Sequence, residues 1–413
     1  CVLTLKESVE SDAVDIPKTI TELYKRAIKV LLWRHHPLCK LGSIGRPKGY
    51  LVQKLPKVFG KDVQEMKSLG RKIVEEGILI FVEPSISDFH HLANCGLLHQ
   101  IPDKRRNLLC FLHLTLQEFL AAWCIVDDWH CIANFLDDHV EDFQWHLVIE
   151  FIVGLVGDLK REKKVESICH IEERFQKWIM LLQSYSGDKR LAFLGIQCLY
   201  ELRDGDVIRS ACTKLKHGSQ EIFVNNITFT PVYSNALFQF ATECAHITKL
   251  NFRTCQLLDK YSCNGIETFL SNGASYNLTS LSFHGCKFND NFMSHLTKAV
   301  KSKNCKLAEL DICHSNIADQ GAKYLSEAFK SENCYLIKFI IRHNNITDEG
   351  AKYLCETFES NICKLSKLDI GQNSIADVGS FHISQALKSK NCNLTELDLR
   401  QDSVTDEGAT FLG

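Results

Sequence analysis

Apolar residues recur at a fixed interval in the last third of the chain. Segments of one layout, with apolar residues at their first, fourth and sixth positions, follow one another every 29 residues. They begin at Leu278, Leu307, Leu336, Leu365 and Leu394, and a weaker copy begins at Ile247. Alternation at the fourth to sixth positions is the period of a strand with one buried face. The stretch that follows, DQGAKYLSEAFK at 319–330, has the spacing of an amphipathic helix, with Ala322, Leu325, Ala328 and Phe329 on one side. The pattern predicts six stacked strand-helix copies.

The ninth position of each copy carries a small or polar side chain. Its occupants are Cys255, Cys286, Ser315, Asn344, Asn373 and Asp402. We expect them to satisfy buried backbone groups of the neighbouring copy at the turn that ends each strand. Asp319 precedes a helical stretch and is expected to cap the helix of its own copy.

The motif L-x-x-L-x-L-x-x-N/C resembles the leucine-rich repeat of the ribonuclease-inhibitor type. This resemblance implies an α/β horseshoe, or solenoid, whose concave sheet leaves its non-core positions available for a partner. The partner-binding candidates at these positions are Asp311, His314, Ile340, Arg342, His343, Asp369, Asp398 and Arg400. Mixed charge around an apolar Ile340 favours a protein partner over nucleic acid, since phosphate binding needs a continuous basic stripe. A solvated face without any partner is the alternative.

The region before the repeats is predominantly helical. The pattern predicts an amphipathic helix within VDIPKTITELYKRAIKVLLWRHH (14–36), a second helix at 61–76, and a hairpin formed by GLLHQI and NLLCFLHL. This layout is typical of a winged helix. Thr115 and Glu118 form a predicted capping box that starts a helix at Leu116, so His113 comes just before a helix N-terminus, where an anion is favoured. Helical patches fill 127–240, and 222–240 is expected to be an irregular edge leading into the repeats.

Three segments of this region resemble the NACHT-domain NOD-like receptors: PKTITELY at 17–24, LGRKIVEEGIL at 69–79 and FLHLTLQEFLAA at 111–122. The resemblance implies that residues 1–50 end a helical domain of the nucleotide-binding module. It further implies a winged helix at 51–125, a second helical domain at 126–240, and repeats at 241–413 with the last copy truncated. It also implies that His113 contacts the ADP phosphate in the parent receptor. Judged from the residues alone, a satisfied buried histidine is the alternative.

The phosphate-binding half of such a receptor is not found in this sequence. It has no G-x-x-x-x-G-K-[ST] motif, so we expect no ATP or ADP bound to this chain by itself, only to the parent receptor. No HExxH or GxSxG motif indicates an enzyme, and we predict neither catalytic nor metal-binding residues. The pairs His35 with His36 and His90 with His91 are expected to be solvent-exposed.

Composition fits a cytoplasmic protein. The 413 residues carry a net charge of -2, without a leader or a long apolar run. The 19 cysteines form no C-x-x-C pair, and Cys305, Cys334, Cys363 and Cys392 recur once per copy, as packing residues in a reducing compartment would. We expect the chain to be a fragment at both ends.

Three functional hypotheses follow. The first is the sensing or autoinhibitory part of a cytosolic NOD-like innate immune receptor, which binds a protein ligand or regulatory protein and whose full-length form self-oligomerises. The second is a leucine-rich-repeat scaffold or inhibitor without a nucleotide switch. The third is that the intact protein is an ATPase whose catalytic half lies upstream. None of them involves nucleic acid or a membrane.

Overall fold

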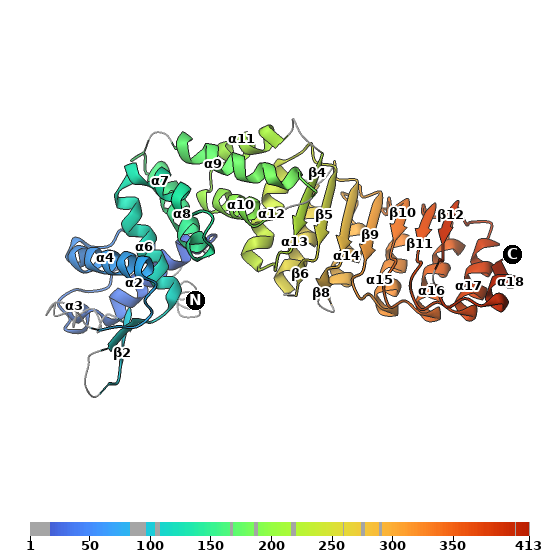
Figure 1. Ribbon diagram of the computed structural model, residues 1–413, viewed down its shortest axis with the longest axis horizontal. Coiled ribbons are helices and arrows are strands. Elements are labelled where there is room, and N and C mark those ends of the chain that lie inside the picture. Colours follow the sequence, from blue (N-terminus) through green and yellow to red (C-terminus); the bar gives the residue numbers. More distant parts are fainter. Residues whose placement is uncertain are drawn as a thin grey trace. The chain divides into compact units, whose positions relative to one another are not determined.

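The structure is a computed structural model that describes residues 17–82, 96–103, 108–165, 168–185, 189–215, 220–258, 260–273, 277–288, 291–400 and 402–412. The chain divides into two compact units. The first unit extends to Arg174 and includes Gln197–Asp204, and the second comprises Phe175–Ile196 and Gly205–Gly413. Figure 1 shows the elements of both. His90 and His91 lie outside the described residues.

The first unit combines helices with a small antiparallel sheet. Its helices are α2 (Ile20–His35), α3 (Pro37–Lys40), η1 (Lys57–Phe59), α4 (Gly60–Glu76), α6 (Leu114–Asp127), η2 (Trp129–Cys131), α7 (Ile132–His139), η3 (Phe143–Trp145) and α8 (His146–Arg161). Its strands are β1 (Phe81–Val82), β2 (Leu98–Ile101) and β3 (Leu108–Phe111), in the order β1-β3-β2. The two predicted helices at the start of the chain and the hairpin are confirmed, with Leu98 opposite Phe111.

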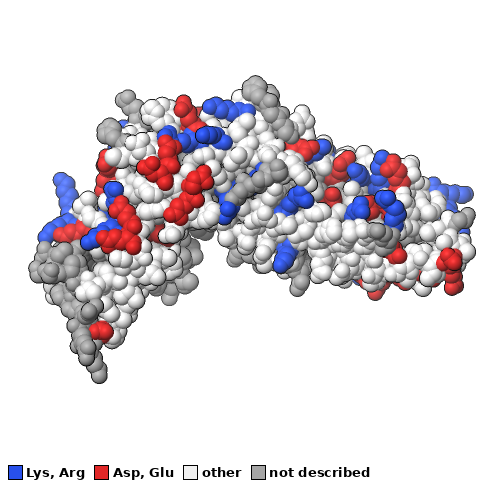
Figure 2. Space-filling model, viewed as in Figure 1, with Lys and Arg blue, Asp and Glu red and all other residues white. Residues whose placement is uncertain are grey.

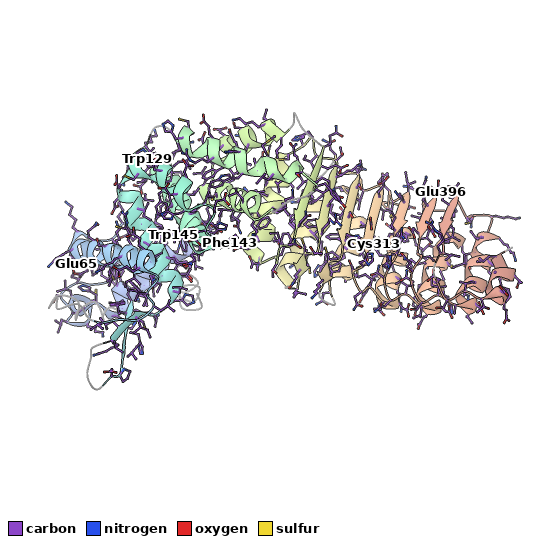
Figure 3. The ribbon with its side chains drawn as sticks, viewed as in Figure 1. Glu65, Trp129, Phe143, Trp145, Cys313 and Glu396 are labelled. Carbon is purple, nitrogen blue, oxygen red and sulfur yellow. The ribbon has the colours of Figure 1, made fainter. Side chains whose placement is uncertain are left out.

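The core of the first unit lies where α4 and α8 pack against α6. Phe119 of α6 and Phe151 of α8 are fully buried, and their rings meet edge to face with centroids 5.1 Å apart. Gly70 lets α4 approach α6, because a Cβ at this position would lie 2.9 Å from the Cβ of Leu120. Glu65 on α4 and Trp145 at the end of η3 are labelled in Figure 3.

Two helices are divided between the units: α9 (Cys169–Ile179) and α10 (Arg190–Leu202). The second unit continues with η4 (Met180–Gln183), α11 (Gly205–Leu215), α12 (Pro231–Glu243), α13 (Lys260–Ser271), α14 (Phe292–Val300), α15 (Asp319–Phe329), α16 (Asp348–Cys355), η5 (Glu356–Glu359), α17 (Asp377–Leu387) and α18 (Asp406–Leu412). Its strands are β4 (Glu221–Asn225), β5 (Lys249–Arg253), β6 (Gln256–Leu257), β7 (Ser280–His284), β8 (Lys287–Phe288), β9 (Glu309–Cys313), β10 (Lys338–Ile340), β11 (Lys367–Asp369) and β12 (Glu396–Asp398).

The repeats build one parallel sheet in the order β12-β11-β10-β9-β7-β5-β4, and β6 pairs with β8 separately. Fourth positions align across the sheet, with Leu310 beside Phe339 and Phe339 beside Leu368. Helices α12 to α18 form a row in which each packs on the next (Figure 1). The predicted strand-helix alternation is confirmed, and the four apolar residues of α15 are buried as expected.

The segment at 222–240 is regular, so the expectation of an irregular edge is wrong. β4 pairs with β5 over five residues, from Glu221 beside Lys249 to Asn225 beside Arg253, and α12 follows. Ile222 and Val224 are buried on the same side as the core residues of β5. The sheet of the described residues therefore has one strand more than the six-copy pattern predicts.

The ninth-position residues join each copy to the next, as predicted. The Asn344 side chain accepts hydrogen bonds from the backbone N–H groups of Ser315 (3.1 Å) and Ile317 (2.9 Å) of the preceding copy. It donates to the carbonyl of Ile312 (2.6 Å) in that copy and to that of Ile341 (3.0 Å) in its own. Buried backbone groups at the turn are satisfied in this way.

The prediction that Asp319 caps its own helix is wrong, because α15 begins after Ala318, whose side chain makes no capping bond. The Asp319 carboxylate reaches the following copy and accepts hydrogen bonds from the N–H groups of Thr347 (2.7 Å) and Gly350 (3.0 Å) at the start of α16. A Cβ at Gly350 would lie 2.3 Å from Asp319 Oδ1. The aspartate of one copy therefore caps the helix of the next copy, and the glycine of that next helix leaves room for the carboxylate.

Candidate functional site: the repeat sheet face

The odd-numbered positions of the repeat strands form the face that is turned away from the core. Along β9 to β12 the fifth positions are Asp311, Ile340, Asp369 and Asp398, which lie side by side in register and are all half-buried. The third positions, Glu309, Lys338, Lys367 and Glu396, form a second row. Figure 3 labels Glu396 and Cys313, the first residue of β12 and the last of β9.

The eighth positions have a shared backbone conformation that the sequence pattern did not reveal. Thr254, Gly285, His314, His343 and Gln372 all have positive φ, between 50° and 64°. Glycine adopts this conformation freely, whereas a β-branched residue such as Thr254 is strained in it. Only Gly285 hints at it in the sequence.

Three histidines form a column beside the sheet. The rings of His314 and His343 stack with centroids 3.8 Å apart and an interplanar angle of 19°, and the ring of His284 lies 4.9 Å from that of His314. Burial, then the neighbouring histidines and Arg342, lower the pKa of His314 below its ordinary value. Burial likewise lowers the pKa of His284, so the imidazoles of His284 and His314 are favoured in the neutral form at neutral pH.

Two arginines of the face are paired with two of its aspartates. Arg342 lies 3.7 Å from the Asp369 carboxylate and donates to Gln372 Oε1 at 2.9 Å. Arg400 donates through Nε to both oxygens of Asp398 at 3.0 Å, and these hydrogen bonds lower the pKa of Asp398 to about 2. Burial raises the pKa of Asp369.

Charge of both signs covers the repeats. Lys367 contacts Glu396 at 2.6 Å, and Lys249 contacts Glu221 at 2.7 Å. Figure 2 shows Lys and Arg interleaved with Asp and Glu over the repeats in this view, without a continuous stripe of one sign. This pattern suits a partner that also carries both charges.

Ile340 is the apolar centre of the face. It lines a groove of about 170 Å³ on the side of β5 to β9, together with Asn251, Asp311 and Lys338. It also lines a hollow of about 780 Å³ on the side of β11 and β12, with Asp369, Asp398 and Arg400. The outer part of this hollow reaches core positions of the last copy, such as Leu397 and Leu399.

All eight partner-binding candidates lie on or next to β9 to β12, so the structure brings them together on one surface. The sequence reasoning left His284 and the third-position residues out of this set. Side chains alternate between the two faces of a strand, so the third position lies on the same face as the fifth and the seventh.

His113 lies outside the repeats, directly before α6, and is exposed. It is the N-cap of this helix: its Nδ1 accepts from the N–H of Thr115 at 3.2 Å and lies 2.7 Å from the Thr115 hydroxyl. The predicted capping box of Thr115 and Glu118 is wrong, because the helix already begins at Leu114. The alternative of a buried histidine does not describe His113 either.

His36 contradicts the expectation that the His35–His36 pair is exposed. It is 4% exposed, its Nε2 lies 2.7 Å from Asp62 Oδ2, and its Nδ1 accepts from the N–H of Leu38. His35, which is half-buried, is the last residue of α2, and His36 is the C-cap of this helix, where the chain leaves the helical conformation and the His36 side chain enters the interior.

Cysteines of the repeats are packing residues, as predicted. Cys305, Cys334 and Cys363 are buried, and Cys392 is partly buried. Burial raises the pKa of Cys334 to about 11, which makes this thiol unreactive at neutral pH. Among the described residues, no group of three or more His, Cys, Asp and Glu side chains could hold a metal ion, and no helix is long and apolar enough to cross a membrane.

One comparison with known families supports the repeats. The family model described as Leucine Rich repeat matches residues 303–326, 332–355 and 390–413. No curated protein matches the chain. Among solved structures, an internalin (inlF) from Listeria monocytogenes str. 4b F2365 is similar at 13% sequence identity, covering 58% of this chain and 86% of its own, with a TM-score of 0.28. At this TM-score the internalin supports no argument about this chain. The matched segments, each of which contains a strand of the parallel sheet and all or most of the helix that follows it, identify this part of the second unit as a leucine-rich-repeat region.

Proposed function

We propose that the sheet face of β9 to β12 binds a protein, and that the repeats form the horseshoe scaffold for this contact. The observation that carries the proposal is Ile340, a half-buried apolar side chain between Asp311 and Asp369 in one row across the sheet. An apolar anchor ringed by polar groups that exclude water is the usual arrangement of an energetic centre in a protein interface. Leucine-rich repeats generally bind proteins, and the proposed role needs no catalysis.

The test compares Ile340 with Ile337, which lies three residues earlier in the chain. Ile340→Ala together with Arg342→Ala should remove most partner capture in quantitative affinity purification from cells. Ile337→Ala is the matched control, since Ile337 is 48% exposed but precedes β10 instead of lying on the sheet face. Equal capture by the double variant and the control would place the binding surface elsewhere.

A second candidate function is the sensing or autoinhibitory part of a cytoplasmic NOD-like receptor. The order of helix, antiparallel hairpin and helix before the repeats, together with the exposed His113 at the start of α6, supports it. In this proposal residues 51–125 act as the winged helix, and His113 contacts ADP held by an upstream module. A repeat ligand would shift the closed state toward an open, self-oligomerising one.

The capping role of His113 allows a clean test in the full-length receptor. His113→Leu removes both the cap and the imidazole, whereas His113→Asn keeps a good N-cap acceptor and removes only the imidazole. If His113 holds ADP, both variants should raise basal signalling and weaken ADP retention. Activation by Leu alone would reduce the effect to a frayed helix, and an upstream sequence without a phosphate loop would leave only the scaffold function.

A further inference from the structure

Five cationic side chains surround a pocket of about 200 Å³ within the first unit. Three of them, Lys25, Arg26 and Lys29, come from α2, and Arg161 comes from α8, which packs against α2. The fifth, Arg203, directly follows α10. These residues are far apart in the sequence, so no local motif indicates the pocket.

Two carboxylates face these five cations, and each is shared by two of them. Glu22 pairs with Arg26 and, at 3.3 Å, with Arg203. Asp158 pairs with Lys25 and, at 2.7 Å, with Arg161. Among the described residues, no other acidic side chain lines the pocket.

Lys29 is held by neutral groups. Its Nζ donates to the carbonyls of Leu51 (2.8 Å) and Gln53 (2.7 Å). Five cations less two carboxylates leave an excess of three positive charges at neutral pH. Burial, followed by repulsion from Lys25 and Arg26, lowers the pKa of Lys29 to about 8.

An excess of this kind is costly in a partly enclosed site. Arg26 is only 4% exposed, and the side chains of Lys25, Arg161 and Arg203 are between 31% and 39% exposed. Charges that are removed from water in this way require compensation by opposite charge and hydrogen bonds. An anion in the pocket would provide both.

We propose that this pocket binds a phosphate-bearing anion. Guanidinium groups match the oxygens of phosphate in a planar, bidentate geometry, and lysine adds a point charge. The pocket volume is several times the roughly 30 Å³ that one water occupies in the liquid, so it has room for a phosphoryl group. His113 is not among the lining residues, so the proposal is independent of both candidate functions.

A neighbouring hollow indicates which kind of phosphate could be bound. A groove of about 980 Å³ shares Lys25, Lys29, Val52 and Asp158 with the pocket and continues to Trp123 and Trp129. An organic phosphate ester could place its phosphoryl group in the pocket and its body in this groove. Free inorganic phosphate would use the pocket alone.

The experiment measures binding of inorganic phosphate and of phenyl phosphate to the full chain by calorimetry, in a phosphate-free buffer at constant ionic strength. Arg203→Gln should weaken phosphate affinity about tenfold, because it removes one cation that has only a single, 3.3 Å ion pair. Lys25→Gln, which disrupts a different pair, should weaken it similarly. Arg71→Gln is the matched control: the Arg71 side chain on α4 is 42% exposed, pairs with Glu75 at 2.8 Å and does not line the pocket.

The outcomes are distinct. Saturable phosphate binding that is lost in Arg203→Gln and Lys25→Gln but retained in Arg71→Gln supports the proposal. Absence of binding, or equal losses in all three variants, overturns it, as does an equal response to chloride at the same ionic strength. If the pocket binds phosphate, tighter binding of phenyl phosphate that falls in Trp129→Ala identifies an ester as the ligand, whereas equal affinities identify free phosphate. Circular dichroism of each variant confirms that it is folded.

Discussion

Asn344→Ala should lower the free energy of unfolding of the repeat unit by about 3 to 5 kcal/mol. The side chain is 7% exposed and its amide contacts five backbone groups. Its NH2 group has only two hydrogens for three carbonyls, so it makes about four full hydrogen bonds. Each hydrogen bond contributes roughly 1 kcal/mol net, and a buried group left without a partner costs roughly 1 to 3 kcal/mol. Because alanine can satisfy none of these groups, the loss falls in the upper range for a point substitution.

Urea unfolding followed by circular dichroism would measure the loss, and hydrogen exchange at the amides of Ser315 and Ile317 would localise it. Asn345→Ala is the control, since Asn345 is exposed and its side chain donates only to Asn316 Oδ1, at 2.7 Å. We expect it to change stability by less than about 1 kcal/mol. If both variants lose the same stability, or Asn344→Ala loses under 1 kcal/mol, the side-chain bonds between copies are not what holds the repeats together.

Three further predictions concern single residues. Gly350→Ala should destabilise the repeats by roughly 1 to 3 kcal/mol, because the added Cβ would lie 2.3 Å from the capping carboxylate of the preceding copy. Gly60→Ala is the control and should not destabilise the protein, because no atom lies within 4 Å of the Cβ added there. Thermal unfolding measures both. Glu150 is fully buried and its pKa is raised well above the ordinary value, so its contribution to stability is greatest below about pH 4.5 and falls as pH rises. Glu150→Gln should therefore raise the melting temperature at pH 7 but not at pH 4, and an equal gain at both would refute this. Arg400→Gln should raise the pKa of Asp398 from about 2 towards its ordinary value, as measured by carboxyl NMR titration.

The sequence was most informative where one period repeats. Side-chain spacing and size predict the strand-helix alternation, the buried fourth and sixth positions and the function of Asn344. The structure confirms them, except that Leu397 and Leu399 of the last copy are only half-buried. Asp319 was misassigned because capping rules consider only N–H groups within the next three residues, whereas its carboxylate accepts from the N–H of Gly350, 31 residues away. β4 was missed because its copy has lost the leucines that mark the others, although Ile222 and Val224 keep the alternation.

The cationic pocket escaped sequence analysis for a different reason. Lys25, Arg26 and Lys29 look like the solvated side of an amphipathic helix, and only packing of α2 against α8 turns them toward Arg161. Likewise, His113 could be placed near a helix N-terminus from sequence, but its function as the cap itself depends on ring orientation. The pocket depends on contacts between residues distant in sequence, whereas the cap depends on how the His113 ring is oriented toward Thr115 two residues later.

The bonds between copies also determine which residues of the sheet face can be tested without damage to the fold. Ninth-position amides and the aspartates at helix starts satisfy the buried backbone of a neighbour, so a copy cannot lose them without destabilising the next. Ile340 takes no part in these side-chain bonds, and its substitution should affect binding alone. Arg342 pairs with Asp369 and donates to Gln372 of the following copy, so the stability of Arg342→Ala has to be measured beside its binding. His314 and His343 differ, because their backbone has positive φ and their rings stack on each other. A substitution there changes the conformational cost of the turn as well as the surface. Loss of binding in Ile340→Ala is therefore direct evidence about the interface, whereas loss in His343→Ala becomes evidence only when the variant is as stable as the parent.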